Sequence, residues 1–148
     1  MMTSTMTVAG LARSTGIDPL DYLDRDATIP VHDEPQSQGD VRVRRLDTTA
    51  VRVRPGAKWA EVPPAGVAVV TGGAGGHAHV LTPGLGGAGP VLWTTDVDDP
   101  EGLAVGVFKS AEPCFLYHVE HGGQGYAPGV RVVRRQREQA DVERLVAD

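Results

Sequence analysis

Alternating apolar and charged residues set the strongest limit on how this chain can fold. Val41-Arg42-Val43-Arg44 and Val51-Arg52-Val53-Arg54 each place valine and arginine in turn, which is the period of a strand with one buried and one exposed face. Turn residues interrupt the chain between such segments, for example at Pro55-Gly56 and Pro63-Pro64. Short strands separated by frequent turns are typical of antiparallel sheets, so the pattern predicts a mainly β protein.

The remaining expected strands are short apolar segments that end at glycine or proline. With nineteen glycines and eleven prolines in 148 residues, turns take up much of the chain, and long helices are not expected. We predict a small antiparallel β-sandwich or β-barrel with an extended N-terminal arm and at most a short C-terminal helix, over residues 139–146. The further expected strands are Val67–Val70, His77–Leu81, Val91–Thr95, Leu103–Phe108, Cys114–His118 and Val130–Arg134.

Charge divides the chain into two parts. Residues 1–40 hold seven acidic and two basic residues, whereas the twelve acidic and twelve basic residues of the remainder cancel. We therefore predict an acidic N-terminal arm over residues 1–38 and a single β-rich domain over residues 39–148. Asp18-Pro19 is a typical helix start and predicts one short helix in the arm, ended by Pro30. A helix this short needs a surface to dock on, either its own domain or a neighbouring subunit.

The single cysteine and the lack of long apolar segments indicate where the protein works. Cys114 has no partner for an internal disulfide, and it lies in an expected strand, where a thiol is usually inert. No segment is long and apolar enough to cross a membrane, and the N-terminus lacks the features of a signal peptide. We expect a cytoplasmic protein, or a virion protein made in the cytoplasm, without membrane contact.

Four of the five histidines form two clusters, which are the strongest candidates for a functional site. Gly76-His77-Ala78-His79 follows a glycine run, and His118-Val119-Glu120-His121 precedes another. On a strand, residues two apart share a face, so His77 can act with His79 and His118 with Glu120. Imidazoles with a carboxylate form a ligand set for one divalent transition metal, such as zinc, iron, manganese or nickel. The candidate metal ligands are therefore His77, His79, His118, Glu120 and His121. Alternatively, the histidines hydrogen-bond to the glycine loops and hold them in place.

Other catalytic patterns are missing from the sequence. There is no Gly-x-Ser-x-Gly motif, and the glycine run before His77 lacks the Lys-Ser/Thr of a phosphate loop. We identify no catalytic and no cofactor-binding residues apart from the candidate metal ligands, which favours a non-enzymatic domain while leaving enzymatic activity and the cofactor open. Arginines are expected to line strand faces, but a neutral domain with few aromatic residues indicates a solvated or ion-paired surface rather than a nucleic-acid site. These arginines are Arg42, Arg44, Arg52 and Arg54 on one hairpin, and Arg131, Arg134, Arg135 and Arg137 on another strand face.

Four motifs follow one another along the chain: Gln38–Val41, Gly76–His79, His118–His121 and Ala127–Glu138. Their order resembles a group of small uncharacterised proteins of bacteria and their phages. That group has a Gly-Asp-Val strand, a Gly-His-Ala-His turn, a His-x-Glu-His and a Pro-Gly … Arg-Gln-Arg-Glu end. The resemblance covers about residues 38–138, implies an uncharacterised β-domain and brings no established activity.

The histidines are also similar to the metal motif of cupins, which are small β-barrels. Cupins bind metal through His-x-His, a glutamate a few residues later and a more distant histidine. His77 and His79 match the first part, and His118 or His121 can stand for the last. Thr82-Pro83-Gly84 occupies the place of the glutamate, so Glu120 would have to supply the carboxylate.

Three functions are consistent with these features. The favoured one is a non-enzymatic structural or interaction domain, a building block or decoration-type accessory protein of a larger homo-oligomeric assembly such as a phage virion, which it contacts through its N-terminal arm. The first alternative is a cupin-like metal-dependent enzyme that uses His77, His79, His118 and His121, with an apolar cleft that includes Trp93 and Phe108. The second alternative is a small ligand-binding or regulatory module. The enzyme requires the four histidines to converge, whereas the building block requires them to lie apart or on a contact surface.

Overall fold

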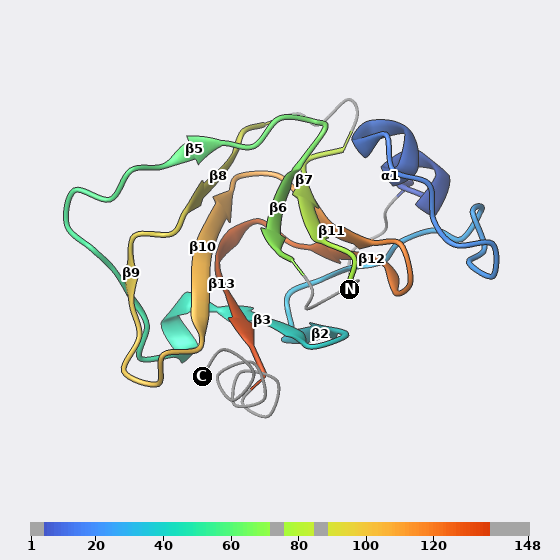
Figure 1. Ribbon diagram of the computed structural model, residues 1–148. Coiled ribbons are helices and arrows are strands. Elements are labelled where there is room, and N and C mark those ends of the chain that lie inside the picture. Colours follow the sequence, from blue (N-terminus) through green and yellow to red (C-terminus); the bar gives the residue numbers. More distant parts are fainter. Residues whose placement is uncertain (1–4, 72–75, 85–88, 137–148) are drawn as a thin grey trace.

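Two β-sheets form the core of the protein, and the computed structural model describes the chain over residues 5–71, 76–84 and 89–136. One sheet has the strand order β1-β12-β11-β7-β6 and the other β2-β3-β13-β10-β8-β5, with β4 and β9 in a separate two-stranded ladder (Figure 1). The predicted mainly β class is confirmed. The two open sheets have the form of a small sandwich, and no closed barrel is present in the described residues.

The strands are short, and one helix precedes them. The elements are α1 (Val8–Thr15), β1 (Val31–His32), β2 (Gln36–Gln38), β3 (Val41–Arg45), the 3-10 helix η1 (Leu46–Thr48), β4 (Arg52–Val53), β5 (Ala60–Glu61), β6 (Val67–Val70), β7 (His79–Thr82), β8 (Val91–Thr94), β9 (Val97–Asp98), β10 (Ala104–Ser110), β11 (Cys114–His118), β12 (Gly122–Tyr126) and β13 (Gly129–Arg135). Neither helix has the length and apolar character needed to cross a membrane, as far as the described residues go.

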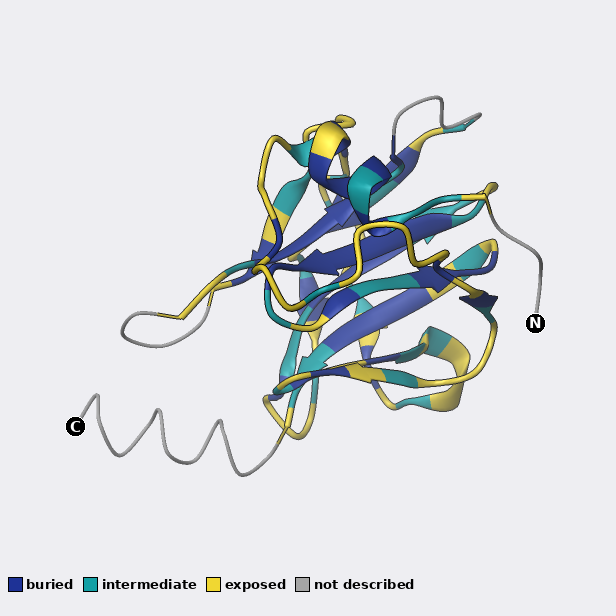
Figure 2. Cartoon of the chain, turned by 90° about the vertical axis from the view of Figure 1, so that its right-hand side faces the viewer, coloured by how far each residue is buried: buried dark blue, intermediate teal, exposed yellow. Residues whose placement is uncertain are grey.

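Side chains from both sheets fill the space between them. Val41 and Val43 of β3 pack in one buried cluster with Phe108 of β10, Leu116 of β11 and Tyr126 of β12. Figure 2 shows dark blue strands through the middle of the molecule and most of the yellow, exposed residues in the loops around them. The alternation of valine and arginine therefore works as expected, because the valines of β3 face the core and Arg42 is exposed.

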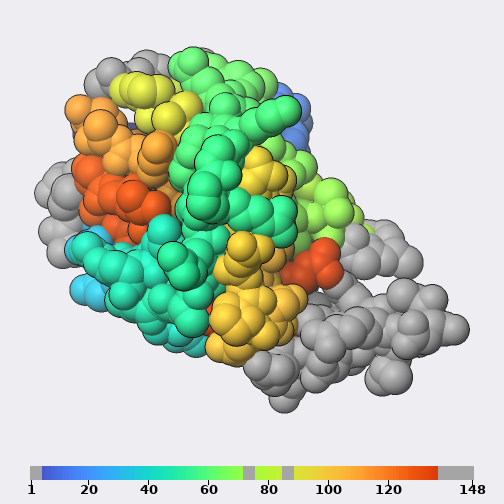
Figure 3. All heavy atoms as spheres, turned by 90° about the vertical axis from the view of Figure 1, so that its left-hand side faces the viewer, coloured from blue at the N-terminus to red at the C-terminus, as the bar shows by residue number. Residues whose placement is uncertain are grey.

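A long excursion of the chain covers part of the outer face of the six-stranded sheet. Val51, the residue before β4, and Val97 of β9 are buried against Val107 of β10 and Val132 of β13. Figure 3 shows the corresponding green segment lying over the neighbouring gold and orange residues. This excursion corrects the expected hairpin of residues 41–44 with 51–54. β3 pairs with β2 and β13, whereas β4 pairs with β9.

The N-terminal helix lies earlier in the chain than predicted. It spans Val8–Thr15, where the Thr7 hydroxyl accepts from the amide of Gly10 and Gly16 ends the helix at φ 73°, as helix-capping residues do. The helix predicted to start at Asp18 is wrong, because residues 18–20 have no regular secondary structure and residues 21–23 form a turn and a bend. Leu20 is 38% exposed and so gives that segment no apolar face to bury. The C-terminal helix expected over residues 139–146 lies outside the described residues.

The N-terminal segment packs on its own domain. Leu11 of α1 is fully buried in a cluster with Ile29 and Tyr117, and β1 runs parallel to β12. Two glycines of β12 permit this approach. A Cβ at Gly123 would lie 2.5 Å from the side chain of Ile29, and one at Gly125 would lie 2.7 Å from the carbonyl oxygen of Pro30.

We predict that Gly125→Ala destabilises the protein by about 1–3 kcal/mol, because the new methyl group meets backbone atoms that cannot move aside. Gly123→Ala is the matched control and costs less, since its obstacles are the ends of the Ile29 and Leu11 side chains. Urea denaturation measures both changes. In Gly125→Ala, the amide of Ala127, which donates to the carbonyl of His32, also exchanges faster with solvent. Equal stability of Gly125→Ala and the wild type would contradict this account of β12.

Candidate functional site

Four histidines converge where β7 meets the turn between β11 and β12. His79 begins β7, His118 ends β11, His121 lies in the turn and His77 precedes β7. The ring of His118 lies 4.4 Å from that of His79 and 4.6 Å from that of His121, centroid to centroid, and 6.2 Å from that of His77. Neighbouring strands cause this convergence, since β7 and β11 pair up to Tyr117 and Val80.

The cluster extends from the interior to the surface. The side chains of His79 and His118 are buried, whereas His77 and His121 are exposed. The Nε2 atom of His77 lies 3.6 Å from Oε1 of Glu120, and both of these side chains are about half exposed. The five residues expected as metal ligands therefore lie in one region of the molecule, with the deepest imidazole linked to solvent through the others.

Gln38 and Asp40 flank His79, and the sequence had not indicated either as a site residue. The Nδ1 atom of His79 lies 2.9 Å from Oε1 of Gln38. The Nε2 atom of the same ring lies 3.3 Å from Oδ1 of Asp40. Gln38 is 2% exposed, and Asp40 is partly exposed at the end of the β2–β3 hairpin. The buried imidazole is therefore held between an amide and a carboxylate from one short segment.

The hydrogen bonds of Gln38 fix the tautomer of His79. The Gln38 amide nitrogen donates to two carbonyl oxygens, of Leu116 at 3.0 Å and of Gly122 at 3.2 Å. Its oxygen must then face His79, and an amide oxygen only accepts hydrogen bonds. His79 therefore carries its proton on Nδ1, and the lone pair of Nε2 points at Asp40. Two acceptors face each other at this place.

His118 has the opposite arrangement. Its Nδ1 accepts a hydrogen bond of 3.1 Å from the amide of Glu120, so the neutral ring carries its proton on Nε2. With Nδ1 engaged in the turn, His118 holds the Glu120–His121 segment in place and stacks between two other imidazoles. The hypothesis that histidines hold the glycine-flanked loops therefore describes His118 well.

Gly39 makes room for the imidazoles. It lies in the two-residue loop between β2 and β3 with φ 58°, a conformation that favours glycine. A Cβ at this position would lie 2.9 Å from Nε2 of His121 and 3.6 Å from Cε1 of His79. The hairpin loop thus brings Asp40 next to His79 and lets His121 lie over the loop backbone.

Burial keeps the deepest imidazole neutral. Desolvation lowers the pKa of His79 to about 4, with a further contribution from His118, while Asp40 acts in the opposite direction. Burial also lowers the pKa of His118, and the charge of His121 adds to this effect. At neutral pH the lone pair of His79 Nε2 is therefore available to a cation.

The described residues hold no group of three or more His, Cys, Asp or Glu side chains placed to bind a metal ion as they stand. Within the histidine cluster, two nitrogen–oxygen pairs are present, His79 with Asp40 and His77 with Glu120. The Nε2 atom of His121 lies over Gly39, which is the residue before Asp40 and also lies close to His79. The arrangement is thus a partial donor set rather than a completed coordination sphere.

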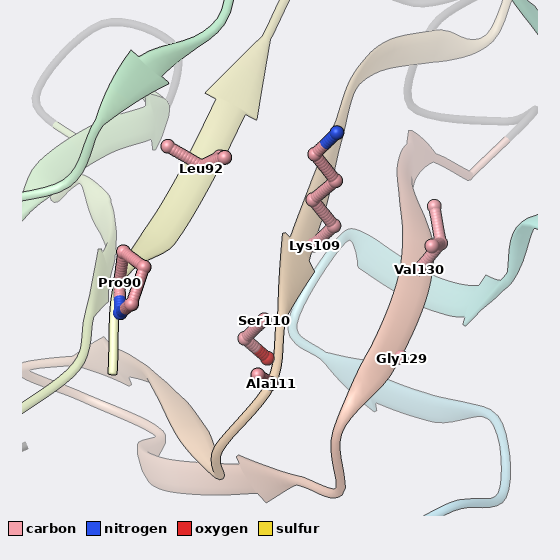
Figure 4. Close-up of a pocket in the computed structure, with 7 residues that line it drawn as sticks. All are labelled: Pro90, Leu92, Lys109, Ser110, Ala111, Gly129 and Val130. Atoms are coloured by element: carbon pink, nitrogen blue, oxygen red, sulfur yellow. The ribbon is translucent and has the colours of Figure 1, made fainter. Parts of the chain in front are cut away.

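Other residues considered from the sequence lie elsewhere. Trp93 and Phe108, expected to line a cleft, are packed in the core between the sheets. Cys114 is fully buried, and burial raises the pKa of its thiol to about 11, which fits an inert thiol. An apolar groove of about 340 Å³ lies on the outer face of the six-stranded sheet, where Leu92, Lys109 and Val130 come from three adjacent strands (Figure 4). None of its lining residues belongs to the histidine cluster.

We predict opposite tautomers for two neighbouring histidines in the metal-free protein at pH 7. Long-range ¹H–¹⁵N NMR spectra are expected to show His79 protonated on Nδ1 and His118 on Nε2. Gln38→Leu removes the acceptor of His79 and the amide that donates to two buried carbonyls, so it abolishes the Nδ1 preference and destabilises the fold by about 2 kcal/mol or more. A wild-type His79 protonated on Nε2 would contradict the network of Gln38.

The comparisons with known proteins concern the same part of the chain. Searches of curated proteins and of solved structures gave no match. One family model matches residues 37–136, from the end of β2 to the residue after β13. The matched segment contains Gln38, Asp40 and all four clustered histidines, and it excludes α1 and β1. By this match over two thirds of its length, the chain belongs to the family described as a domain of unknown function, DUF8820.

Proposed function

We propose that this domain binds one divalent transition-metal ion at the histidine cluster, with His79 and Asp40 as its first ligands. The observation that carries the proposal is the contact between two acceptors, since the lone pair of His79 Nε2 faces Oδ1 of Asp40 at 3.3 Å. A nitrogen and an oxygen that bind the same zinc ion tetrahedrally at about 2.1 Å lie about 3.3–3.4 Å apart. The pair therefore has the spacing of two ligands that share an ion.

A cation between His79 Nε2 and Asp40 Oδ1 would satisfy both of these acceptors. A proton on Nε2 would also satisfy them, but burial disfavours the charged imidazole, as the low pKa of His79 indicates. A divalent ion at the same place is bound by the neutral ring and by the carboxylate together, so it needs no proton on His79. Metal-binding histidines commonly donate their second ring nitrogen to an oxygen acceptor that orients them, which is the role of Gln38 here.

His121 is the natural third ligand, because its exposed ring lies over Gly39 beside the His79–Asp40 pair. A set of two imidazoles and one carboxylate suits zinc, nickel, iron or manganese and leaves positions for water. His118 then acts through the turn that carries His121 and not as a ligand. His77 and Glu120, which are half exposed, lie where the ion would enter from solvent.

The metal would join parts of both sheets. Asp40 belongs to the β2–β3 hairpin of the six-stranded sheet, whereas His79 and His121 belong to β7 and the β11–β12 turn of the other. An ion held by these side chains cross-links the sandwich and stabilises the folded chain in proportion to its affinity. We therefore favour a metal-binding module over an enzyme, since Trp93 and Phe108 lie in the core and supply no substrate cleft.

Titration of the metal-free protein with Zn²⁺ and with Co²⁺ tests the proposal. We expect one ion per chain by calorimetry, a visible Co²⁺ absorption band, and a rise in the melting temperature of the protein. Asp40→Asn keeps the size of the side chain but loses the charge, and it is expected to weaken binding by about 10-fold or more. His79→Ala and His121→Ala weaken it as well.

His32→Ala is the matched control, because His32 lies outside the cluster beside Glu34 and its loss leaves the metal affinity unchanged. Melting curves of each metal-free variant establish that it folds. A wild-type protein that takes up neither ion, or an Asp40→Asn variant with wild-type affinity, would show that the cluster is not a metal site.

The building block of a larger assembly is a second candidate, and one feature of the surface favours it. Ile17, Leu20 and Tyr22 are all exposed and lie on one short segment of the N-terminal arm. This segment is held to the domain, because the amide of Leu20 donates to the carbonyl of Val119 and the hydroxyl of Tyr22 to that of Glu120. Neither a phage origin nor a cupin relationship is needed for this function.

For the second candidate we expect native mass spectrometry of the metal-free wild type to give a homo-oligomer that Leu20→Asp dissociates. Leucine at this position is only partly buried, so the substitution removes an exposed apolar side chain rather than a core residue. Glu34→Gln, another exposed position of the arm, is the control and leaves the oligomer intact. A wild-type monomer at all concentrations would remove the support for this function.

A further inference from the structure

A second cluster of charged side chains lies on the face of β3 and β13 that points away from the core. The register of β3 and β13 places Arg42 directly across from Arg134, and Arg44 across from Val132. The valines of β3 point into the core, so Arg42 and Arg44 point to the outer face of the sheet. Like charges directly opposite each other on neighbouring strands are destabilising. The fold therefore holds these arginines together at a cost in stability.

The arginines surround a hollow in the surface. Arg42, Arg44, Arg134 and Arg135 line a cavity of about 370 Å³, together with Glu101 and Gln136. Arg134 is 13% exposed in its side chain and Arg44 is partly buried, so part of this positive charge is shielded from bulk water. A cavity of this volume is large enough for a small ligand.

Few negative groups balance the positive charge in this cavity. Glu101 lies 3.3 Å from Nη2 of Arg134, and Arg44 donates to the carbonyl of Thr48. No carboxylate pairs with Arg42 or Arg44 among the described residues. The Nε atoms of Arg44 and Arg134 are buried and have no hydrogen-bond partner in that part of the chain. Among the described residues, Arg42 and Arg44 therefore lack a paired carboxylate, whereas Arg134 has Glu101 and also interacts with the charge of Asp99.

From this arrangement we infer that the cavity binds a small, multiply charged oxyanion of the phosphate class. Guanidinium groups donate two parallel hydrogen bonds to the oxygens of such anions. An anion between β3 and β13 would also relieve the repulsion between Arg42 and Arg134. A nucleic-acid strand fits less well, because base stacking needs exposed aromatic rings, and no aromatic residue lines the cavity.

Calorimetric titration with pyrophosphate at fixed ionic strength tests this inference on the full chain. We expect one pyrophosphate per chain and a higher melting temperature when it is bound. Arg42→Gln and Arg134→Gln each weaken the affinity by about 10-fold or more, since each removes charged hydrogen bonds to the anion. Both variants fold, because each removes one member of a repelling pair, and melting curves without ligand verify this.

Arg52→Gln is the matched control. Arg52 is an exposed arginine of β4, outside the cavity and across from Asp98, and its substitution leaves pyrophosphate binding unchanged. Three results would overturn the inference. They are a wild-type protein that does not bind pyrophosphate, an equal loss of affinity in Arg52→Gln, and a single-stranded oligonucleotide that binds through Arg42 and Arg134 when pyrophosphate does not.

Discussion

The side chain of Gln38 makes the contact on which the histidine cluster depends. It belongs to β2 of the six-stranded sheet, yet its amide nitrogen bonds to carbonyls of β11 and β12 in the other sheet. Because both carbonyls are acceptors, the amide oxygen has one possible orientation, toward His79. This buried amide therefore helps to link the two sheets, and it decides which nitrogen of His79 is available. The acceptor pair of His79 and Asp40 follows from that choice.

The architecture also depends on segments that approach the backbone closely at two glycines, Gly39 and Gly125. Gly39 lets the imidazoles of His79 and His121 lie over the hairpin loop, while Gly125 lets the N-terminal segment lie against β12. β12 is thus fixed from two sides, by the N-terminal segment and by the acceptor that Gly122 offers to Gln38. The turn that carries His121 leads directly into this strand.

Local sequence patterns predict many of the strands, but they do not show which distant strands pair with one another. Alternation identified β3, and short apolar segments identified β6, β8, β11 and β13 within a residue or two. β12 was missed, since Gly122–Tyr126 contains three glycines and has no strand composition. The helix was placed too late, because Asp18-Pro19 is a stronger local signal than Thr7, whose helix is stabilised by the burial of Leu11.

The candidate site likewise contains residues that the sequence predicts and residues that it does not. The two histidine clusters were visible because each lies beside glycine at the end of a strand. Asp40 and Gln38 were visible only as a motif without chemistry, since their partner His79 is 41 residues away from Gln38. The pairing of Arg42 with Arg134 likewise depends on a strand register that no local pattern contains. Without that register, the sequence cannot distinguish a solvated face of arginines from a cavity that arginines line.

One short strand connects the features that carry the two proposed sites. Asp40 precedes β3, Val41 and Val43 anchor it in the core, and Arg42 projects to the outer face. Gln136 links the ends, because its amide donates to the carbonyl of Asp40 and its side chain to that of Gly39, while it also lines the arginine cavity. The alternation of β3 therefore separates an acceptor pair suited to a cation from a donor cluster suited to an anion. Because both are attached to the same anchored hairpin, the core residues that fix its register also fix the position of each.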